Sequence, residues 1–130
     1  MKNNNPLHLR RTGWIWQGLT PKQTDREEYQ FRNPVYGYRA AFITIRTLVW
    51  RRNLSTVARL LTEWQPDADG RDSQLYTARV CALTGFAPTD AVDPLDANCM
   101  IPLVCAISRI ENNVHSRMFD VVAAWRIYMG

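Results

Sequence analysis

Beyond residue 32, apolar residues recur at the three- and four-residue spacing of amphipathic helices. Start and stop signals divide this part of the chain into five expected helices. They cover residues 33–51, 57–64, 72–84, 93–111 and 116–129. No alternating strand pattern of useful length interrupts them, so the pattern predicts an all-α (mainly α) fold.

Particular residues mark the expected helix ends. Asn33 can act as an N-cap, with Pro34 in the first helical position. Gly85 fits the position just after a helix, and Ser116 is expected to cap the last helix. Pro102 should bend the fourth helix or mark its true first turn.

The first 32 residues lack a sustained period and are punctuated by Gly13, Gly18 and Pro21. A short hairpin around Trp14 to Trp16 is one interpretation of this segment. Because 130 residues suit a single hydrophobic core, we expect one domain over residues 1–130, with residues 1–32 packed on the helices. Gly37 would allow another backbone to approach the first helix closely.

Composition adds aromatic residues and a basic balance to this picture. Five Trp, five Tyr and four Phe are many for the length, and some are expected to lie on a surface groove. The net charge of +4 favours anionic partners, such as nucleic acid, acidic lipid or the bacterial envelope, without choosing among them. The arginines are spread over the whole chain, which argues against a nucleic-acid-binding module.

The cysteines indicate a reducing compartment. Cys81, Cys99 and Cys105 form no CxxC pair, and Cys81 and Cys105 are expected to be buried free thiols of a protein made in the cytoplasm. Only His8 and His115 could assist them, so neither a metal nor a cofactor is expected. The chain shows neither a signal-peptide pattern nor an apolar run long enough to span a membrane.

Glu111 is the most informative carboxylate. It continues the apolar stripe of the fourth helix, which comprises Met100, Leu103, Val104 and Ile107. Burial and the negative end of the helix dipole both favour the protonated form, which a general acid needs. The alternative is a structural ion pair with Arg109 or Arg117.

The remaining acidic groups give weaker signals. Glu27 and Glu28 are typical of a solvated loop, and Asp67 and Asp69 suit a cap or an exposed loop. The motifs of phosphate-binding loops, zinc proteases and serine hydrolases are absent from the sequence.

Short motifs occur in a specific order along nearly the whole chain. They are Asn3–Arg10, Trp16–Leu19, Asn33–Ala40, Asn53–Val57 and Ala106–Asn112. In this order the chain resembles a family of phage and prophage virion structural proteins, which includes the murein-lytic protein of enveloped double-stranded RNA phages. Members of that family read RNNNPGNIR, WQGL, SPEYGIRA, LNTV and AIIRHEN at these places.

The resemblance implies a compact lysozyme-like domain that cleaves the glycan strand of peptidoglycan, in the manner of a lytic transglycosylase or muramidase. Glu111 would be the general acid. The expected saccharide-binding residues are Asn4, Asn5, Trp16, Tyr36 and Asn112. Peptidoglycan is the expected partner, together with other virion proteins, and the protein would be virion-associated or delivered to the periplasm and cell wall.

The motif order also suggests a circular permutation. In bacterial glucosaminidases and lytic transglycosylases an Asn-rich turn follows the catalytic Glu, whereas here the Asn-rich turn comes first. Asn4 and Asn5 would then face Glu111 across a cleft.

A non-catalytic virion or envelope-binding protein that retains the fold is the alternative function. Four departures from the family pattern favour it, namely Leu7, His8, Ile110 and Asn113.

Overall fold

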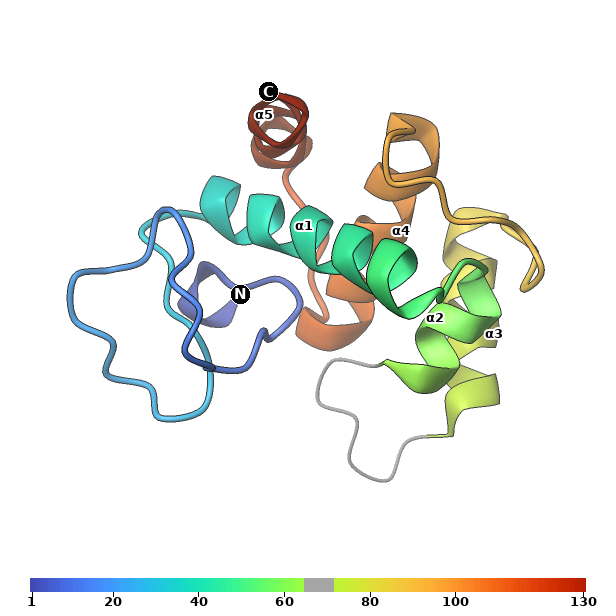
Figure 1. The fold of residues 1–130 in the computed structure, drawn as a ribbon, viewed down its shortest axis with the longest axis horizontal. Helices are drawn as coiled ribbons and strands as arrows, with labels where there is room; N and C mark the ends of the chain where they lie inside the picture. The colour runs from blue at the N-terminus through green and yellow to red at the C-terminus, as the bar shows by residue number, and fades with distance from the viewer. Residues whose placement is uncertain (65–71) are drawn as a thin grey trace.

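A computed structural model describes residues 1–64 and 72–130, and the expected positions Asp67 and Asp69 lie outside this range. Its elements are η1 (Lys2–Asn4), α1 (Pro34–Arg52), α2 (Val57–Glu63), α3 (Ser73–Thr84), α4 (Ala97–Asn112) and α5 (Met118–Met129) (Figure 1). The described residues form no extended strand, only isolated bridges. The prediction of a mainly α fold is therefore confirmed.

Helix α1 lies at the centre of the molecule and contacts both α4 and α5 (Figure 1). Phe42 of α1 packs edge-to-face on Trp125 of α5, with ring centroids 5.2 Å apart, and its ring centroid lies 5.5 Å from that of Tyr128. The apolar stripe of α4 is fully buried at Met100 and Ile107, among other positions. Helices α2 and α3 pack on one another, and α3 also packs on α4.

The helix ends mostly follow the sequence signals. Asn33 accepts a hydrogen bond from the backbone N–H of Val35, 3.0 Å away, and Gly85 ends α3 with a φ of 78°. Pro102 lies inside α4, beyond its first turn. The expected cap at Ser116 is wrong, because α5 begins at Met118 after Arg117 and has no side-chain cap.

The hydroxyl of Ser116 has another partner. It accepts a hydrogen bond of 2.7 Å from the hydroxyl of Tyr38 on α1. The contact ties the loop before α5 to the central helix, which explains why this serine does not cap α5.

The N-terminal segment is irregular, as expected, but the suggested hairpin is absent. The only bridges among its residues pair Arg10 with Glu28 and Leu19 with Phe31, and residues 14–16 lie in the loop between them. The hydroxyl of Tyr29 donates to the backbone carbonyl of Trp14, which holds this loop from its base.

The three cysteines form no disulfide, as expected, but Cys81 and Cys105 are half-buried where full burial was expected. Within the described residues, no helix is long and apolar enough to cross a membrane.

Candidate functional site

Glu111 lies in the last turn of α4, where α4 meets α3. Its side chain is half-buried, and its Oε2 accepts a hydrogen bond of 2.8 Å from the hydroxyl of Tyr76 on α3. Tyr76 is buried, so its hydroxyl is held in place by the surrounding core. Arg109, one of the two arginines considered as partners of Glu111, donates to the Oδ1 of Asn113 at 3.5 Å.

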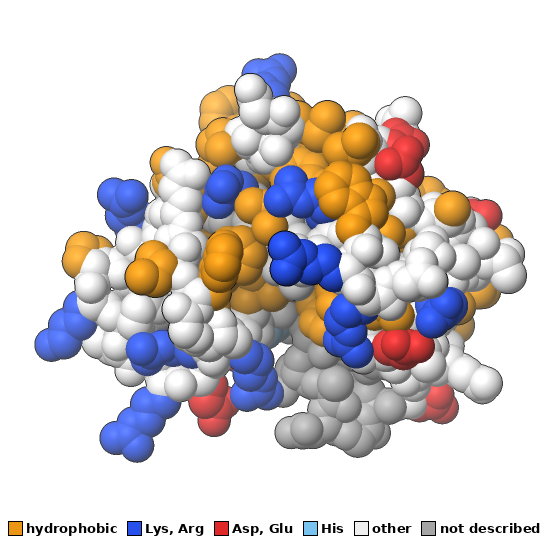
Figure 2. Space-filling model, in the orientation of Figure 1, with side chains coloured by type: hydrophobic (Ala, Val, Ile, Leu, Met, Phe, Trp, Pro, Cys, Tyr) orange, Lys and Arg blue, Asp and Glu red, His pale blue; other side chains and the backbone are white. Residues whose placement is uncertain are grey.

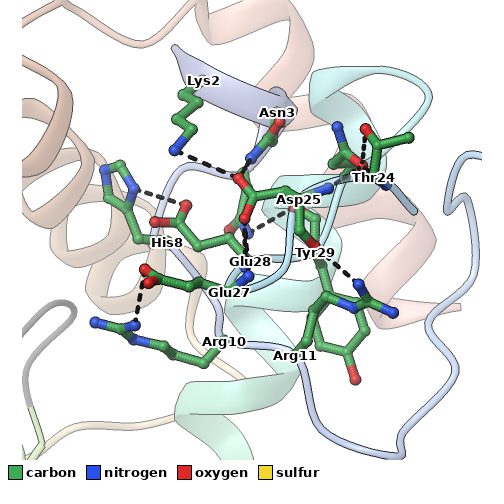
Figure 3. Close-up of polar contacts among 12 residues, drawn as sticks. Lys2, Asn3, His8, Arg10, Arg11, Thr24, Asp25, Glu27, Glu28 and Tyr29 are labelled. Atoms are coloured by element: carbon green, nitrogen blue, oxygen red, sulfur yellow. Dashed lines mark hydrogen bonds and ion pairs between the residues drawn. The ribbon is translucent and has the colours of Figure 1, made fainter.

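A histidine from the N-terminal segment supports the end of α4. The Nε2 of His8 lies 3.4 Å from the backbone oxygen of Glu111, and its Nδ1 lies 3.0 Å from Oε1 of Glu28 (Figure 3). The side chains of His8 and Glu28 are only 16% and 13% exposed. Because both ring nitrogens face acceptors, both contacts are hydrogen bonds when both nitrogens carry protons.

The two adjacent glutamates have different environments. Glu27 is 73% exposed and pairs with Arg10 at 3.4 Å, as a solvated loop would predict (Figure 3). Glu28 is enclosed against His8, so the interpretation as a solvated loop is wrong for this residue. The spacing gave no signal of this pair, because 20 positions separate Glu28 from His8.

Asn112 joins the N-terminal turn to α4. Its Nδ2 lies 2.9 Å from the backbone oxygen of Pro6, 2.9 Å from the backbone oxygen of Ser108 and 3.1 Å from the Oγ of Ser108. Two residues that follow the Asn-rich turn, Pro6 and His8, thus contact the end of α4 directly, where a cleft between Asn4, Asn5 and Glu111 was expected.

The asparagines of the turn itself have backbone partners. Asn4 donates to the backbone oxygen of Phe31 at 3.0 Å. Asn5 is fully buried, donates to the backbone oxygens of Leu9 and Tyr29, and accepts from the N–H of Leu9. We therefore assign Asn5 a structural role in place of the expected saccharide contact.

Trp16 and Tyr36 have different surroundings. The ring of Tyr36 packs against Gly18 so closely that an added Cβ would be 2.1 Å from its Cγ, and the guanidinium of Arg32 lies 5.9 Å from the ring centroid. Trp16 contacts Trp14 edge-to-face, with ring centroids 6.1 Å apart, beside α1. Tyr36 thus anchors the N-terminal segment to α1, and Trp16 lines a groove.

The four departures from the family pattern are accommodated by the fold. Leu7 is fully buried, and Ile110 is half-buried on α4. His8 has a φ of 51° and Asn113, which ends α4, has a φ of 55°. This left-handed region favours glycine, but Asn and His are among the residues that tolerate it best.

Asp25 organises the loop that carries Glu28. Its carboxylate accepts hydrogen bonds from the backbone N–H groups of Glu27 and Glu28, at 2.8 Å and 3.1 Å, and from the side chain of Asn3 at 2.9 Å (Figure 3). Lys2 adds an ion pair at 3.3 Å. The N–H of Glu27, the amide of Asn3 and the N–H of Glu28 hold the pKa of Asp25 well below its ordinary value of 3.8.

This lowered pKa gives an expected pH dependence. The contribution of Asp25 to stability is present above pH ~4 and is lost as the pH falls toward its pKa in the folded state. As the pH is lowered from neutral to ~2, the thermal midpoint of the parent should fall, and we expect it to fall less in Asp25→Asn. Thermal unfolding followed by circular dichroism measures both. An identical acid-side fall in the variant and the parent would contradict this assignment.

Within residues 1–64 and 72–130, no three His, Cys, Asp or Glu side chains gather to hold a metal ion. No family model and no curated protein matches the chain.

Proposed function

We propose that the chain is a phage-derived peptidoglycan-degrading enzyme that cleaves the glycan strand with Glu111 as its general acid. The observation that carries the proposal is the half-buried carboxyl of Glu111, oriented by the hydroxyl of Tyr76 at 2.8 Å. The helix end that presents it is supported by the N-terminal turn through Asn112 and His8. A fixed position is what a general acid needs first, because its proton must lie within hydrogen-bond reach of the leaving oxygen.

In the proposed reaction, Glu111 protonates the leaving oxygen of the bond between N-acetylmuramic acid and N-acetylglucosamine, and the transition state resembles an oxocarbenium ion. A second carboxylate, that of Glu28, is connected to this region through His8, which contacts both Glu28 and the backbone oxygen of Glu111. The carboxylate of Glu28 is engaged by the imidazole of His8, which suits a positioning role through His8. A single acid favours a transglycosylase-type route, in which a hydroxyl of the same sugar attacks the anomeric carbon as the leaving group departs and returns its proton to Glu111.

The second candidate is a non-catalytic virion or cell-envelope-binding protein. It is favoured by the turn asparagines, because the side-chain amides of Asn4 and Asn5 bond to backbone carbonyls within the N-terminal segment. Amides held in this way are less available to a sugar.

The purified chain, mixed with purified cell walls, distinguishes the two candidates. We expect the turbidity of the suspension to fall and the released muropeptides to be lighter by one water than hydrolysis products. Sedimentation of the protein with intact walls, with no fall in turbidity, would support the binding protein instead. Muropeptides with the mass of hydrolysis products would still support an enzyme but would reject the transglycosylase-type route.

A further inference from the structure

A groove of about 620 Å³ runs between the N-terminal segment and the C-terminal half of α1. Its principal lining residues are Trp14, Trp16, Ile43, Arg46, Trp50 and Arg51. Trp14 is 64% exposed, Trp50 is 58% exposed, and Ile15, which follows Trp14, is 85% exposed. Apolar surface that stays in water does not gain the free energy of burial. A continuous exposed apolar surface of this kind is typical of a site that binds a partner.

The polar groups of the groove restrict the partner. The hydroxyls of Thr44 and Thr47 donate to backbone carbonyls of their own helix, at 2.8 Å and 2.9 Å. Of the described residues that line the groove, none is acidic, and the strong donors are the guanidinium groups of Arg46 and Arg51. The groove therefore suits a partner that is both apolar and anionic.

The arrangement of the aromatic rings distinguishes a lipid surface from a nucleic acid. Trp14 and Trp16 meet at an interplanar angle of 69°, so they do not offer two parallel ring faces to successive bases. An aliphatic tip such as Ile15 has no role in base stacking, but it enters the boundary between headgroups and acyl chains readily. Tryptophan is likewise enriched at that boundary.

The positive charges beside the groove also favour a lipid surface that is anionic. The guanidinium of Arg46 lies 5.8 Å from the ring centroid of Trp50 and 5.2 Å from that of Tyr128, which keeps a positive charge beside the aromatic surface. Figure 2 shows Lys and Arg side chains gathered with apolar side chains over the face that α1 crosses, whereas the acidic side chains of this face lie mostly toward the right of the view. An anionic bilayer attracts such a face.

We propose that this face docks on a membrane surface rich in anionic phospholipid. Ile15, Trp14 and Trp50 enter the headgroup boundary, and Arg46 and Arg51 pair with lipid phosphates. The docking is peripheral and is independent of the proposed cleavage of peptidoglycan.

Sedimentation of the whole chain with lipid vesicles tests the proposal. We expect binding to vesicles of phosphatidylcholine mixed with phosphatidylglycerol, weak binding to phosphatidylcholine alone, and loss of binding as salt is added. Ile15→Ser and Trp50→Ala should each weaken binding by about three- to ten-fold. Arg51→Gln should weaken it by about five-fold.

Two matched variants on α5 serve as controls. Phe119 is 82% exposed, and Arg126 lies beside it on a surface that shares no residue with the groove. Phe119→Ser and Arg126→Gln should change binding by less than about two-fold. The proposal is overturned if these controls weaken binding as much as the groove variants, or if neutral vesicles bind equally well. It is also overturned if the chain ignores vesicles but binds a single-stranded oligonucleotide through Trp50 and Arg51.

Discussion

Replacing Glu111 with glutamine is expected to lower the rate of cell-wall lysis by ~10²–10⁴, the usual contribution of general acid catalysis. Glutamine keeps the shape of the side chain, and its amide oxygen can still accept the hydrogen bond that Tyr76 donates to Glu111 at 2.8 Å. It cannot donate a proton as an acid. The thermal midpoint should therefore be unchanged or slightly higher, because a half-buried carboxyl no longer has to be desolvated.

A structural Glu111 would behave in the opposite way. If its charge balanced a buried arginine, the glutamine variant would lose stability, by about 3–5 kcal/mol for a fully buried pair. Turbidity loss and the thermal midpoint, measured on the same variant, separate the two roles. A parent protein that lyses walls and a variant that does so equally well would rule out the catalytic role.

Two further variants make the comparison specific. Glu63→Gln alters a carboxylate that pairs with Arg59 at 3.6 Å on the exposed face of α2, and lysis should not change. Tyr76→Phe removes only the hydroxyl that orients Glu111. Because Tyr76→Phe leaves a carboxyl at position 111 that can still donate its proton, this variant should lose less activity than Glu111→Gln.

The helices could be predicted from the sequence because their signals are local. Asn33 and Gly85 determine helix ends through groups within a few residues, and the structure confirms both. The prediction that Ser116 caps the last helix was wrong, because its hydroxyl bonds to Tyr38, 78 positions away. A local capping signal takes no account of such a distant contact. The hairpin suggested around Trp14 failed for the same reason, because the distant Tyr29 holds that loop.

The candidate site could be predicted only in part. The position of Glu111 on the buried stripe of α4 follows from helical spacing, so the sequence could select it. The partners of this region, His8 and Glu28, come from an irregular segment whose path depends on a network around Asp25. Irregular backbone has no period, so nothing in the sequence placed Glu28 beside His8 or directed the amide of Asn5 into the core.

Adding a single methyl group at Gly37 should disrupt the packing of the N-terminal turn on α1. A Cβ there would lie 1.9 Å from the backbone oxygen of Asn4 and 2.9 Å from Cδ of Pro6. In an ordinary helix interior, Gly→Ala stabilises by about 0.5–1 kcal/mol. Here the obstacle is backbone, which cannot rotate away as a side chain can, and we expect Gly37→Ala to destabilise the fold by about 2–3 kcal/mol.

Gly13→Ala is the matched control, because Gly13 is exposed and a Cβ there would meet no atom within 4 Å. That variant should be neutral or slightly more stable, by up to about 1 kcal/mol, since alanine restricts the unfolded chain. Urea denaturation of the two variants checks the opposite signs. Equal midpoints for Gly37→Ala and the parent would mean that the turn shifts without cost.

The same substitution connects the turn to the proposed site. Displacing the backbone at Asn4 and Pro6 moves the carbonyl of Pro6 that accepts from Asn112, 2.9 Å away, and with it the support of the helix end that carries Glu111. At temperatures where Gly37→Ala is still folded, lysis should therefore fall, and the amides of residues 2–9 should exchange faster than those of α1. Full lysis by a variant whose turn exchanges freely would show that Glu111 acts without support from the N-terminal segment.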